Sequence, residues 1–325
     1  MTIFNFGSIV IDNFYKTPRI PIPGESVRAE SFKKGLGGKG ANQSIAAKKA
    51  GSDVFHIGAV GLDGNRELEL MKKHGIDVDH VNYSHLNTGH ANITIDPSGE
   101  NAITFYAGAN DTQTLERIKK GFENAKPKDI CLLQNEVNLV LEAAKIAKSH
   151  KMKVIYSAAP FDLSHVRKVL SFIDLVVVNE TEYALLLKAF GKRFNKPLLI
   201  TNGAKGSCYL SNDDNFRVKS PTVQPVDTTG AGDTYLGYFA SSLDQKKSVH
   251  DAMEIASFAA ALQVTRYGTS EAIPSLSEVK MFWKNLLSNL SADRHHLPLL
   301  KLITNLPCRD FAVWTVAVPA GLTFD

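Results

Sequence analysis

The chain has 325 residues, of which 44% are hydrophobic and 22% are charged, a composition typical of a folded globular protein. Its formal net charge of +4 comes from lysines scattered in pairs rather than gathered in a block, which disfavours a nucleic-acid-binding or membrane-surface protein. The length suits one large α/β domain, alone or with a small accessory domain.

The N-terminal stretch MTIFNFGSIVID has no basic leader and no cleavage site, so it predicts a first strand and not a signal peptide. The three cysteines are far apart and odd in number, which favours a reducing compartment. The most apolar late stretch is broken by Pro319 and is too short for a membrane span. We therefore expect a cytoplasmic protein.

The first third of the chain mixes strands, helices and turns. A strand over about 3–11 is followed by a polar, Pro-rich stretch without helical period, which predicts turns and short exposed strands. Helices are expected at 40–51 and 65–75, on either side of a strand at 53–61. Residues 81–107 alternate in polarity around Pro97-Ser98-Gly99, which predicts a hairpin.

From about residue 113 the pattern becomes regular, with runs of Val, Ile and Leu alternating with amphipathic helices. Expected strands lie at 129–134, 153–159, 174–179, 197–201 and 206–211. Expected helices lie at 113–124, 138–150, 180–190, 231–239 and 250–265. This alternation predicts an α/β fold with a mostly parallel central sheet and helices on both faces.

The insertions at about 13–36 and 88–107 do not fit the alternation and predict a small β lid attached to the sheet. Residues 1–290 are therefore expected to form one domain. Residues 291–325 break the pattern and form a C-terminal extension to which the sequence gives no role.

The stretch GLGGKGANQ, residues 35–43, places closely spaced glycines before a helix, where backbone amides favour polar or anionic groups. It is not a P-loop, because Lys39 is followed by Gly40 and no strand directly precedes it. A dinucleotide-binding fingerprint is also absent after the first strand. Alone, the stretch fits a ligand loop and a merely flexible helix start equally well.

The stretch VNETEYALL, residues 178–186, brings Asn179 and Glu180 to the carboxyl end of a buried strand, where open α/β sheets bind ligands. Asn179 and Glu182 have the spacing of a capping box, which would be a purely structural role. The functional alternative is that both side chains organise water around a nucleotide-bound Mg²⁺. The sequence leaves both interpretations open.

The stretch PVDTTGAGDTYLGYF, residues 225–239, places Gly230, Ala231 and Gly232 at a helix start, which is the geometry of an oxyanion or phosphate hole. Helix-dipole stabilisation would explain Asp233 but not two glycines just before it. A helix N-terminus lowers an aspartate's pKa and makes it a weak base, which phosphoryl transfer tolerates because its transition state is loose. Acyl transfer would need a nucleophile elbow, and none occurs.

In their order and spacing these stretches make the sequence resemble the ribokinase, or PfkB-type, family of carbohydrate and nucleoside kinases. The resemblance covers about residues 3–283. The matching motifs are GGKGAN at 37–42, YAGAN at 106–110, LQNE at 133–136, NETE at 179–182, TNGAKG at 201–206, DTTGAGDT at 227–234 and VTRYG at 264–268.

The resemblance implies a β-α-β sandwich with a β lid, ATP as phosphoryl donor, Mg²⁺, a potassium-like ion, and a homodimer formed through the lids. It implies that Asp233 activates the acceptor hydroxyl and that the turn Gly230, Ala231 and Gly232 holds the transferring phosphate. The implied sugar contacts, besides Asp233, are Asp12, Gly38, Lys39, Asn42 and Glu136.

The implied nucleotide contacts are Asn179, Thr201, Asn202, Gly203, Ala204, Lys205, Gly206 and Gly232, with Glu182 reaching Mg²⁺ through water. The implied shell of the monovalent ion is Asp227, Thr229, Gln263, Arg266 and Gly268.

Three positions depart from the family pattern. Val10 replaces an asparagine usual in ribose-specific members, the stretch SAAP stands at 157–160, and Ala272 replaces a common serine of the ion shell. We expect an ATP-dependent kinase of a sugar primary hydroxyl, with ribose as acceptor and ribose 5-phosphate as product. The alternatives are a nucleoside, fructose or ketodeoxygluconate as acceptor, or a catalytically idle sensor of sugar or nucleotide.

Overall fold

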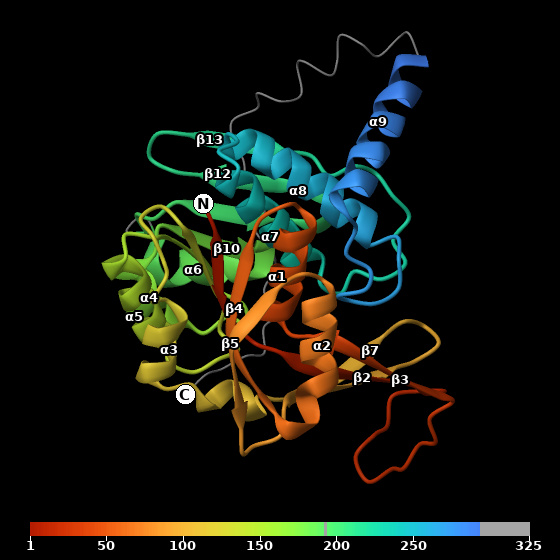
Figure 1. Cartoon of the computed structure of the whole chain (residues 1–325). Helices are drawn as coiled ribbons and strands as arrows, with labels where there is room; N and C mark the ends of the chain where they lie inside the picture. Colours follow the sequence, from red (N-terminus) through yellow and green to blue (C-terminus); the bar gives the residue numbers. More distant parts are fainter. Residues whose placement is uncertain (192–193, 293–325) are drawn as a thin grey trace.

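The computed structural model describes residues 1–191 and 194–292, so most of the predicted C-terminal extension lies outside the described residues (Figure 1). A nine-stranded sheet forms the centre. Its strands, from one edge to the other, are β13 (Asn215–Val218), β12 (Ser207–Leu210), β11 (Leu198–Thr201), β10 (Leu175–Asn179), β9 (Lys153–Ser157), β8 (Ile130–Leu133), β1 (Ile3–Phe6), β4 (Val54–Gly61) and β5 (Asp77–Ser84).

The strands from β11 to β5 pair in parallel, and β12 and β13 add an antiparallel edge. The predicted α/β class and mostly parallel sheet are therefore confirmed. Because the carboxyl ends of the parallel strands meet at one edge of the sheet, the loops that follow β1, β8, β10 and β11 gather there.

Helices cover both faces of the sheet because alternate strand residues point to opposite sides. One core cluster includes Ile3 and Leu132 and a second includes Phe4 and Leu133. The helices on the first side are α1 (Lys39–Lys49), α2 (Asn65–Lys73), α7 (Ala231–Asp244), α8 (Val249–Gln263) and α9 (Leu276–Ala292). Those on the second are α3 (Leu115–Gly121), α4 (Val140–Ser149), α5 (Leu163–Val169) and α6 (Glu180–Phe190).

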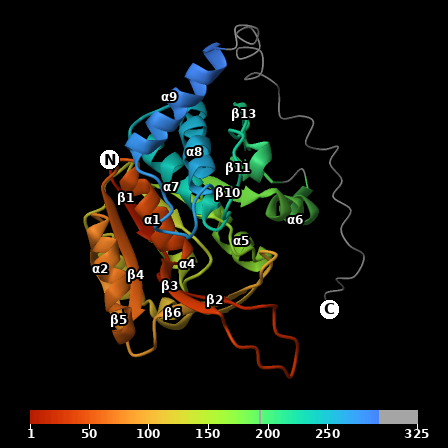
Figure 2. The ribbon, with the colours of Figure 1, turned by 90° about the vertical axis from the view of Figure 1, so that its right-hand side faces the viewer.

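A four-stranded sheet stands apart from the central one, in the place expected for the lid. Its order is β3 (Ser31–Gly37), β2 (Val10–Lys16), β6 (Gly89–Ile95), β7 (Asn101–Tyr106). Figure 2 shows this lid at the end of the molecule opposite α9. It begins at Val10, earlier than expected, because the predicted strand over 3–11 breaks into β1 and β2. The Asn110 side chain holds the break by bonding both the amide and the carbonyl of Ile9, each at 3.0 Å.

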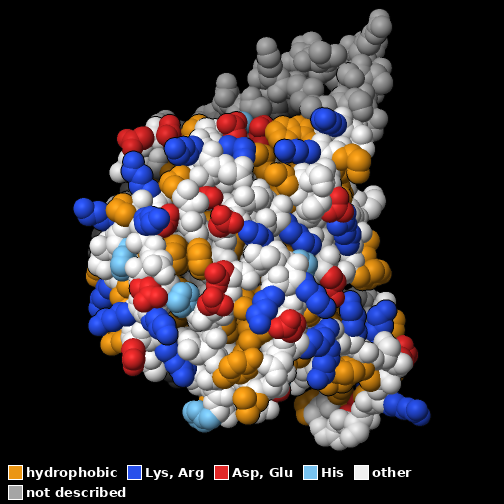
Figure 3. All heavy atoms as spheres, in the orientation of Figure 1, with side chains coloured by type: hydrophobic (Ala, Val, Ile, Leu, Met, Phe, Trp, Pro, Cys, Tyr) orange, Lys and Arg blue, Asp and Glu red, His pale blue; other side chains and the backbone are white. Residues whose placement is uncertain are grey.

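Sequence reasoning missed four elements: β5, α5, β13 and α9. The β5 sequence DVDHVNYS is largely polar, so an edge strand of this kind lacks the apolar run that marked the buried strands. Within the described ranges, no helix combines the length and apolarity needed to cross a bilayer. Figure 3 shows Lys, Arg, Asp and Glu side chains interspersed over one face, without a block of one sign.

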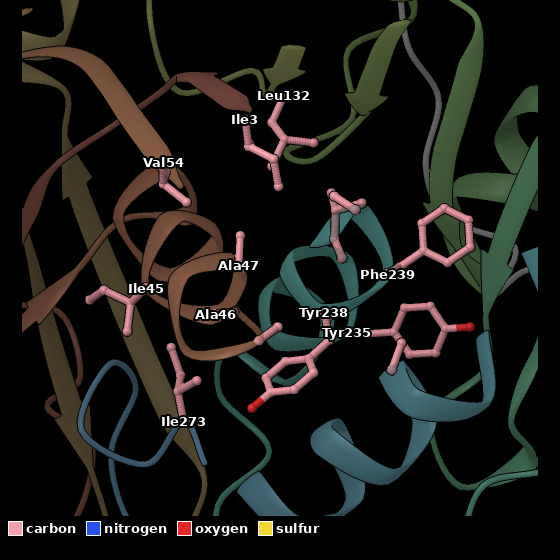
Figure 4. Packing of buried hydrophobic residues seen from close by; sticks show 14 of the residues in the cluster. Ile3, Ile45, Ala46, Ala47, Val54, Leu132, Tyr235, Tyr238, Phe239 and Ile273 are labelled. Atoms are coloured by element: carbon pink, nitrogen blue, oxygen red, sulfur yellow. The ribbon is translucent and has the colours of Figure 1, made fainter. Parts of the chain in front are cut away.

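Helix α7 packs closely against α1, and a glycine makes the approach possible. A Cβ placed on Gly237 would lie 2.6 Å from the Gln43 carbonyl oxygen and closer still to Ala46 Cβ. Figure 4 shows Ala46 and Ala47 on the turns of α1 that face α7. The small residues on α1 and α7 therefore set the distance between these two helices, both of which also carry polar residues.

We expect Gly237→Ala to destabilise the protein by about 1–3 kcal/mol, because the added methyl group must push α7 away from α1. Gly232→Ala, in the same helix, is the matched control. Nothing lies within 4 Å of a Cβ at that position, so its free energy of unfolding should stay within about 1 kcal/mol of the wild type. Urea denaturation measures both, and equal stability of the two variants would contradict the packing argument.

Candidate active site

The turn before α7 has the backbone geometry of an anion hole. Gly230 precedes the helix with φ 75°, a left-handed conformation that favours glycine. The amides of Gly232 and Asp233 belong to the first helical turn, whose N–H groups have no acceptor within the helix. These amides and the positive end of the helix dipole can therefore hold an anionic group.

The Asp233 carboxylate lies in the first turn of α7 and is only 9% exposed. Two side chains of α1 donate hydrogen bonds to it: Gln43 Nε2 to Oδ1 at 2.9 Å and Asn42 Nδ2 to Oδ2 at 3.3 Å. The close packing of α7 on α1 thus delivers the predicted base to the predicted sugar contact Asn42.

Glu136 and Lys39 form a charged pair beside Asp233. The carboxylate of Glu136 accepts hydrogen bonds from Ser8 Oγ at 2.6 Å and from the Lys39 amide at 2.9 Å, and Lys39 Nζ lies 4.0 Å from Glu136 Oε1. The charge of Asp233 raises the pKa of Lys39, and burial raises the pKa of Glu136. One partly buried cation therefore faces two carboxylates, one in the first turn of α7 and one in the stretch that follows β8.

Asp12 lies on lid strand β2 and is 7% exposed. Burial, followed by the charges of Glu136 and Glu271, raises its pKa from 3.8 to about 7. A Cβ on Gly37, on the neighbouring strand β3, would overlap the Asp12 carboxylate, so a larger residue there would displace that carboxylate. Gly38, with φ 92°, follows directly, and Val10 borders its backbone.

The start of α6 forms the capping box that the sequence allowed. Asn179 Oδ1 accepts from the Glu182 amide at 2.9 Å, and Glu182 Oε2 accepts from the Asn179 amide at 2.8 Å. Burial raises the pKa of Glu182, and the charge of Lys39 lowers it. Asn179 and Glu182 therefore do form the capping box. Glu182 also lies close enough to Lys39 for its charge to affect the Glu182 carboxyl.

The turn over residues 201–206 lies beside that capping box, since Thr201 pairs in register with Asn179. It holds Thr201, Asn202, Gly203, Ala204, Lys205 and Gly206, with a 3-10 turn over 203–205. Lys205 pairs with Glu180 at 3.3 Å. Asn202 Oδ1 is buried without a hydrogen-bond partner among the described residues, so this turn retains an unused acceptor.

The residues expected around a monovalent ion also lie together. Asp227 accepts from the Thr229 amide at 2.9 Å and from the Gly268 amide at 3.1 Å, and Gln263 Nε2 donates to the Thr229 carbonyl at 2.9 Å. Arg266 directs its guanidinium at Glu278 on α9, at 2.7 Å, so only its carbonyl can face a cation.

The profile of the family described as pfkB family carbohydrate kinase matches residues 2–276 of the chain. The chain belongs to this family. Phosphoryl transfer depends on positioning and on charge stabilisation, and the start of α7 places helix-terminal amides beside the carboxylate of Asp233.

Two similar proteins illustrate the range of this carbohydrate kinase family. The chain is 33% identical over 294 residues to the ribokinase of Lactococcus lactis, covering 87% of this chain and 97% of that protein. It is 32% identical over 302 residues to the deoxyribokinase of Salmonella typhi, covering 86% and 97%.

Two solved structures share the fold of this kinase. The ribokinase of Cryptococcus neoformans in complex with ADP is 30% identical, with a TM-score of 0.75 and coverage of 86% of this chain and 99% of that one. The Arabidopsis thaliana ribokinase complexed with ribose and ATP is 26% identical, with a TM-score of 0.74 and coverage of 86% and 98%.

Sequence reasoning missed several residues that act on the predicted site residues. Gln43 bonds Asp233 directly, Gln134 bonds Gln43 at 2.6 Å, and Glu271 acts on Asp12 through its charge. Gln43 carried a signal, since it is polar within the Ala-rich helix GANQSIAAKKAG. No feature of the sequence marked Glu271, because only the fold places it near lid strand β2.

We expect Asp12 of this kinase to titrate near pH 7 in the absence of sugar, and Glu271→Gln to lower that pKa by removing a neighbouring negative charge. Because folding raises the pKa of Asp12 from 3.8, its contribution to stability is complete below pH 4 and is lost as the pH rises through about 7. Carboxyl-detected NMR measures the midpoint. Glu69→Gln on α2 is the control that should not move it, and a wild-type midpoint below pH 5 would contradict the electrostatic argument.

Proposed function

We propose that this kinase transfers the γ-phosphoryl group of ATP to the primary hydroxyl of ribose, giving ribose 5-phosphate. The observation that carries the proposal is the place of Asp233, a buried carboxylate beside helix-terminal amides and opposite Lys39, Asn42 and Glu136. The Lactococcus lactis ribokinase and the Arabidopsis ribokinase bound to ribose and ATP support the choice of acceptor and donor.

In the proposed mechanism Asp233 orients the acceptor hydroxyl and accepts its proton as the phosphoryl group transfers. The loose transition state places most of the demand on positioning and on charge stabilisation. The amides at Gly230, Ala231 and Gly232 would stabilise the transferring group, as an anion hole at a helix start does.

The proposed sugar contacts combine acceptors and donors, as vicinal hydroxyls require. Asp12 and Glu136 supply carboxylates, and Lys39 and Asn42 supply donors beside the Gly38 backbone. Asn42 Oδ1 is buried without a hydrogen-bond partner among the described residues. An unused acceptor in a buried site fits an incoming hydroxyl, because leaving it unmatched is costly.

The proposed nucleotide contacts are Asn179, the turn over 201–206 and Gly232, all at the carboxyl edge of the sheet. The relatives solved with ADP and with ATP support this choice of nucleotide. Mg²⁺ would neutralise the phosphates and keep several of its waters. Glu182 fits this role through water, since the capping box uses one of its oxygens and the other is left for a ligand.

A potassium-like ion is proposed beside the anion hole. The carboxylate of Asp227 and the carbonyls near Thr229, Gln263, Arg266 and Gly268 are oxygen donors, which suit a hard cation. The hydrogen bonds that join Asp227 to Thr229 and Gly268 support the grouping. Ala272 is buried and contributes no hydroxyl to such a shell.

A cytoplasmic homodimer joined through the lids remains part of the proposal. Strand β7, at one edge of the lid sheet, is exposed along its whole length and carries Ile103, Phe105 and Tyr106. An edge strand that is paired on one side only and carries apolar side chains is a surface that a second copy could cover.

We expect Asp233→Asn to lower kcat on the order of a thousandfold or more while ATP binding persists, because the amide cannot accept the hydroxyl proton. Coupled kinase assays and calorimetric titration with ATP measure the two effects. The acceptors are ribose, 2-deoxyribose, fructose, ketodeoxygluconate and a nucleoside, each with and without K⁺. A wild type that turns over no acceptor would favour the idle sensor instead.

Val10 favours a second candidate acceptor, 2-deoxyribose. Val10 and Asp12 lie on the same side of β2, and the apolar side chain of Val10 borders Gly38 without any group that can bond a hydroxyl. A sugar hydroxyl that is buried against Val10 without a hydrogen-bond partner costs about 1–3 kcal/mol. A sugar that lacks this hydroxyl therefore loses little binding free energy at this position. The similar deoxyribokinase of Salmonella typhi supports testing this acceptor.

We expect the wild type to accept both pentoses, and Val10→Asn to raise the ratio of kcat/KM for ribose over 2-deoxyribose by about tenfold through one added hydrogen bond. Val10→Ala, which adds no polar group, is the control and should leave the ratio nearly unchanged. A ratio that does not respond to Val10→Asn would place Val10 outside the sugar contacts.

A further inference from the structure

A network of buried hydrogen bonds runs from Asp233 into the core, beyond the residues assigned above. Gln134 Nε2 donates to Gln43 Oε1 at 2.6 Å and to Asn5 Oδ1 at 2.9 Å. Asn5 Nδ2 donates to the Gly40 carbonyl at 2.8 Å and to Ser44 Oγ at 2.9 Å. The side chains of this network are fully buried, so water does not compete for their bonds.

The direction of these bonds is set at one end by the backbone. The Gly40 carbonyl can only accept, so it fixes the Asn5 amide nitrogen toward itself and the Asn5 oxygen toward Gln134. The NH₂ group of Gln134 must then face Asn5 and Gln43, which turns the Gln43 oxygen inward. The Gln43 nitrogen is thereby directed at Asp233, and reversing it would place two acceptors face to face.

His56 lies at the far end of the network, and its hydrogen bonds agree with the donor–acceptor direction that the Gly40 carbonyl sets. It is fully buried, and burial lowers its pKa to about 4, so the ring is neutral at pH 7. Its Nε2 lies 3.2 Å from the Gly7 carbonyl and its Nδ1 lies 2.8 Å from Ser44 Oγ. With the proton on Nε2, Ser44 donates to the ring and accepts from Asn5, which agrees with the direction fixed at Gly40.

We propose that Gln43 is a positioning residue for Asp233. Its amide holds Oδ1 and leaves Oδ2, beside Asn42, to accept the proton of the incoming hydroxyl. Gln134 and Asn5 act through Gln43 by fixing the amide's direction. The proposal rests on the proposed phosphoryl transfer, and it adds the group that decides which oxygen of the carboxylate reacts.

Gln43→Met tests the proposal, because it keeps the size of the side chain and removes the donor. We expect kcat to fall about tenfold to a hundredfold, with the KM values for sugar and ATP changed less than about threefold. Gln113→Met is the matched control. Gln113 is buried, its side-chain amide has no hydrogen-bond partner among the described residues, and it lies outside the network, so kcat should stay at the wild-type value.

Gln43→Glu gives a readout that a purely structural role would not move. The carboxyl group introduced at this position can donate to Asp233 while it is protonated, and it repels Asp233 once it ionises. We therefore expect kcat of Gln43→Glu to be highest on the acidic side and to fall as the pH rises, where the wild type does not fall. A wild-type pH profile in this variant, or full kcat in Gln43→Met, would overturn the proposal.

Crystal structures of the wild type and Gln43→Met separate this proposal from the proposed function. If the wild type phosphorylates no acceptor, the proposed function fails. The positioning role of Gln43 is then tested by the conformation of the Asp233 side chain in the two crystal structures. One Asp233 rotamer in the wild type and several in Gln43→Met would support positioning. The same single rotamer in both would reject it.

Discussion

The close approach of α7 to α1 is the constraint on which the site depends. Gly237 lies one helical turn beyond Asp233 and on the same face, so the contact that brings Gly237 over Ala46 also brings Asp233 over Asn42 and Gln43. A larger residue at either small position would move the carboxylate away from its donors. Packing and chemistry are thus two consequences of one helix–helix distance.

The start of α1 has a similar double role. Gly40 packs so tightly against Gly7 and Ser8 that no side chain fits there, which joins the end of β1 to the beginning of the helix. The Lys39 amide and Ser8 then share the Glu136 carboxylate. Loops that follow β1 and β8 therefore meet α1 at the carboxyl edge of the sheet, and α7 completes the group.

The sequence allowed the fold to be predicted where patterning was strong. Apolar runs such as DLVVVN identified buried parallel strands, and the glycines around Lys39 and before Asp233 marked helix starts that the structure brings together. The polar strand β5 was missed because it lacks that pattern. For Asn179 and Glu182 the spacing was correct for a capping box, but spacing alone cannot show that Lys39 lies near.

The buried network was beyond the reach of sequence reasoning. Gln43 and Gln134 are 91 residues apart, and Asn5 lies on a third element, so no local spacing relates them. Glutamine has many structural uses, and only the direction of its amide gives it a role here. The raised pKa of Asp12 likewise depends on its burial and on the charges of Glu136 and Glu271, which are distant from it in the sequence.

The most direct test of the account is a crystal structure of the protein with ribose and a non-hydrolysable ATP analogue. The account predicts the primary hydroxyl within about 3.2 Å of Asp233 Oδ2, the terminal phosphate at the amides before α7, and Oδ1 still on Gln43. A sugar bound with its primary hydroxyl away from Asp233, or a phosphate bound elsewhere than the start of α7, would contradict it.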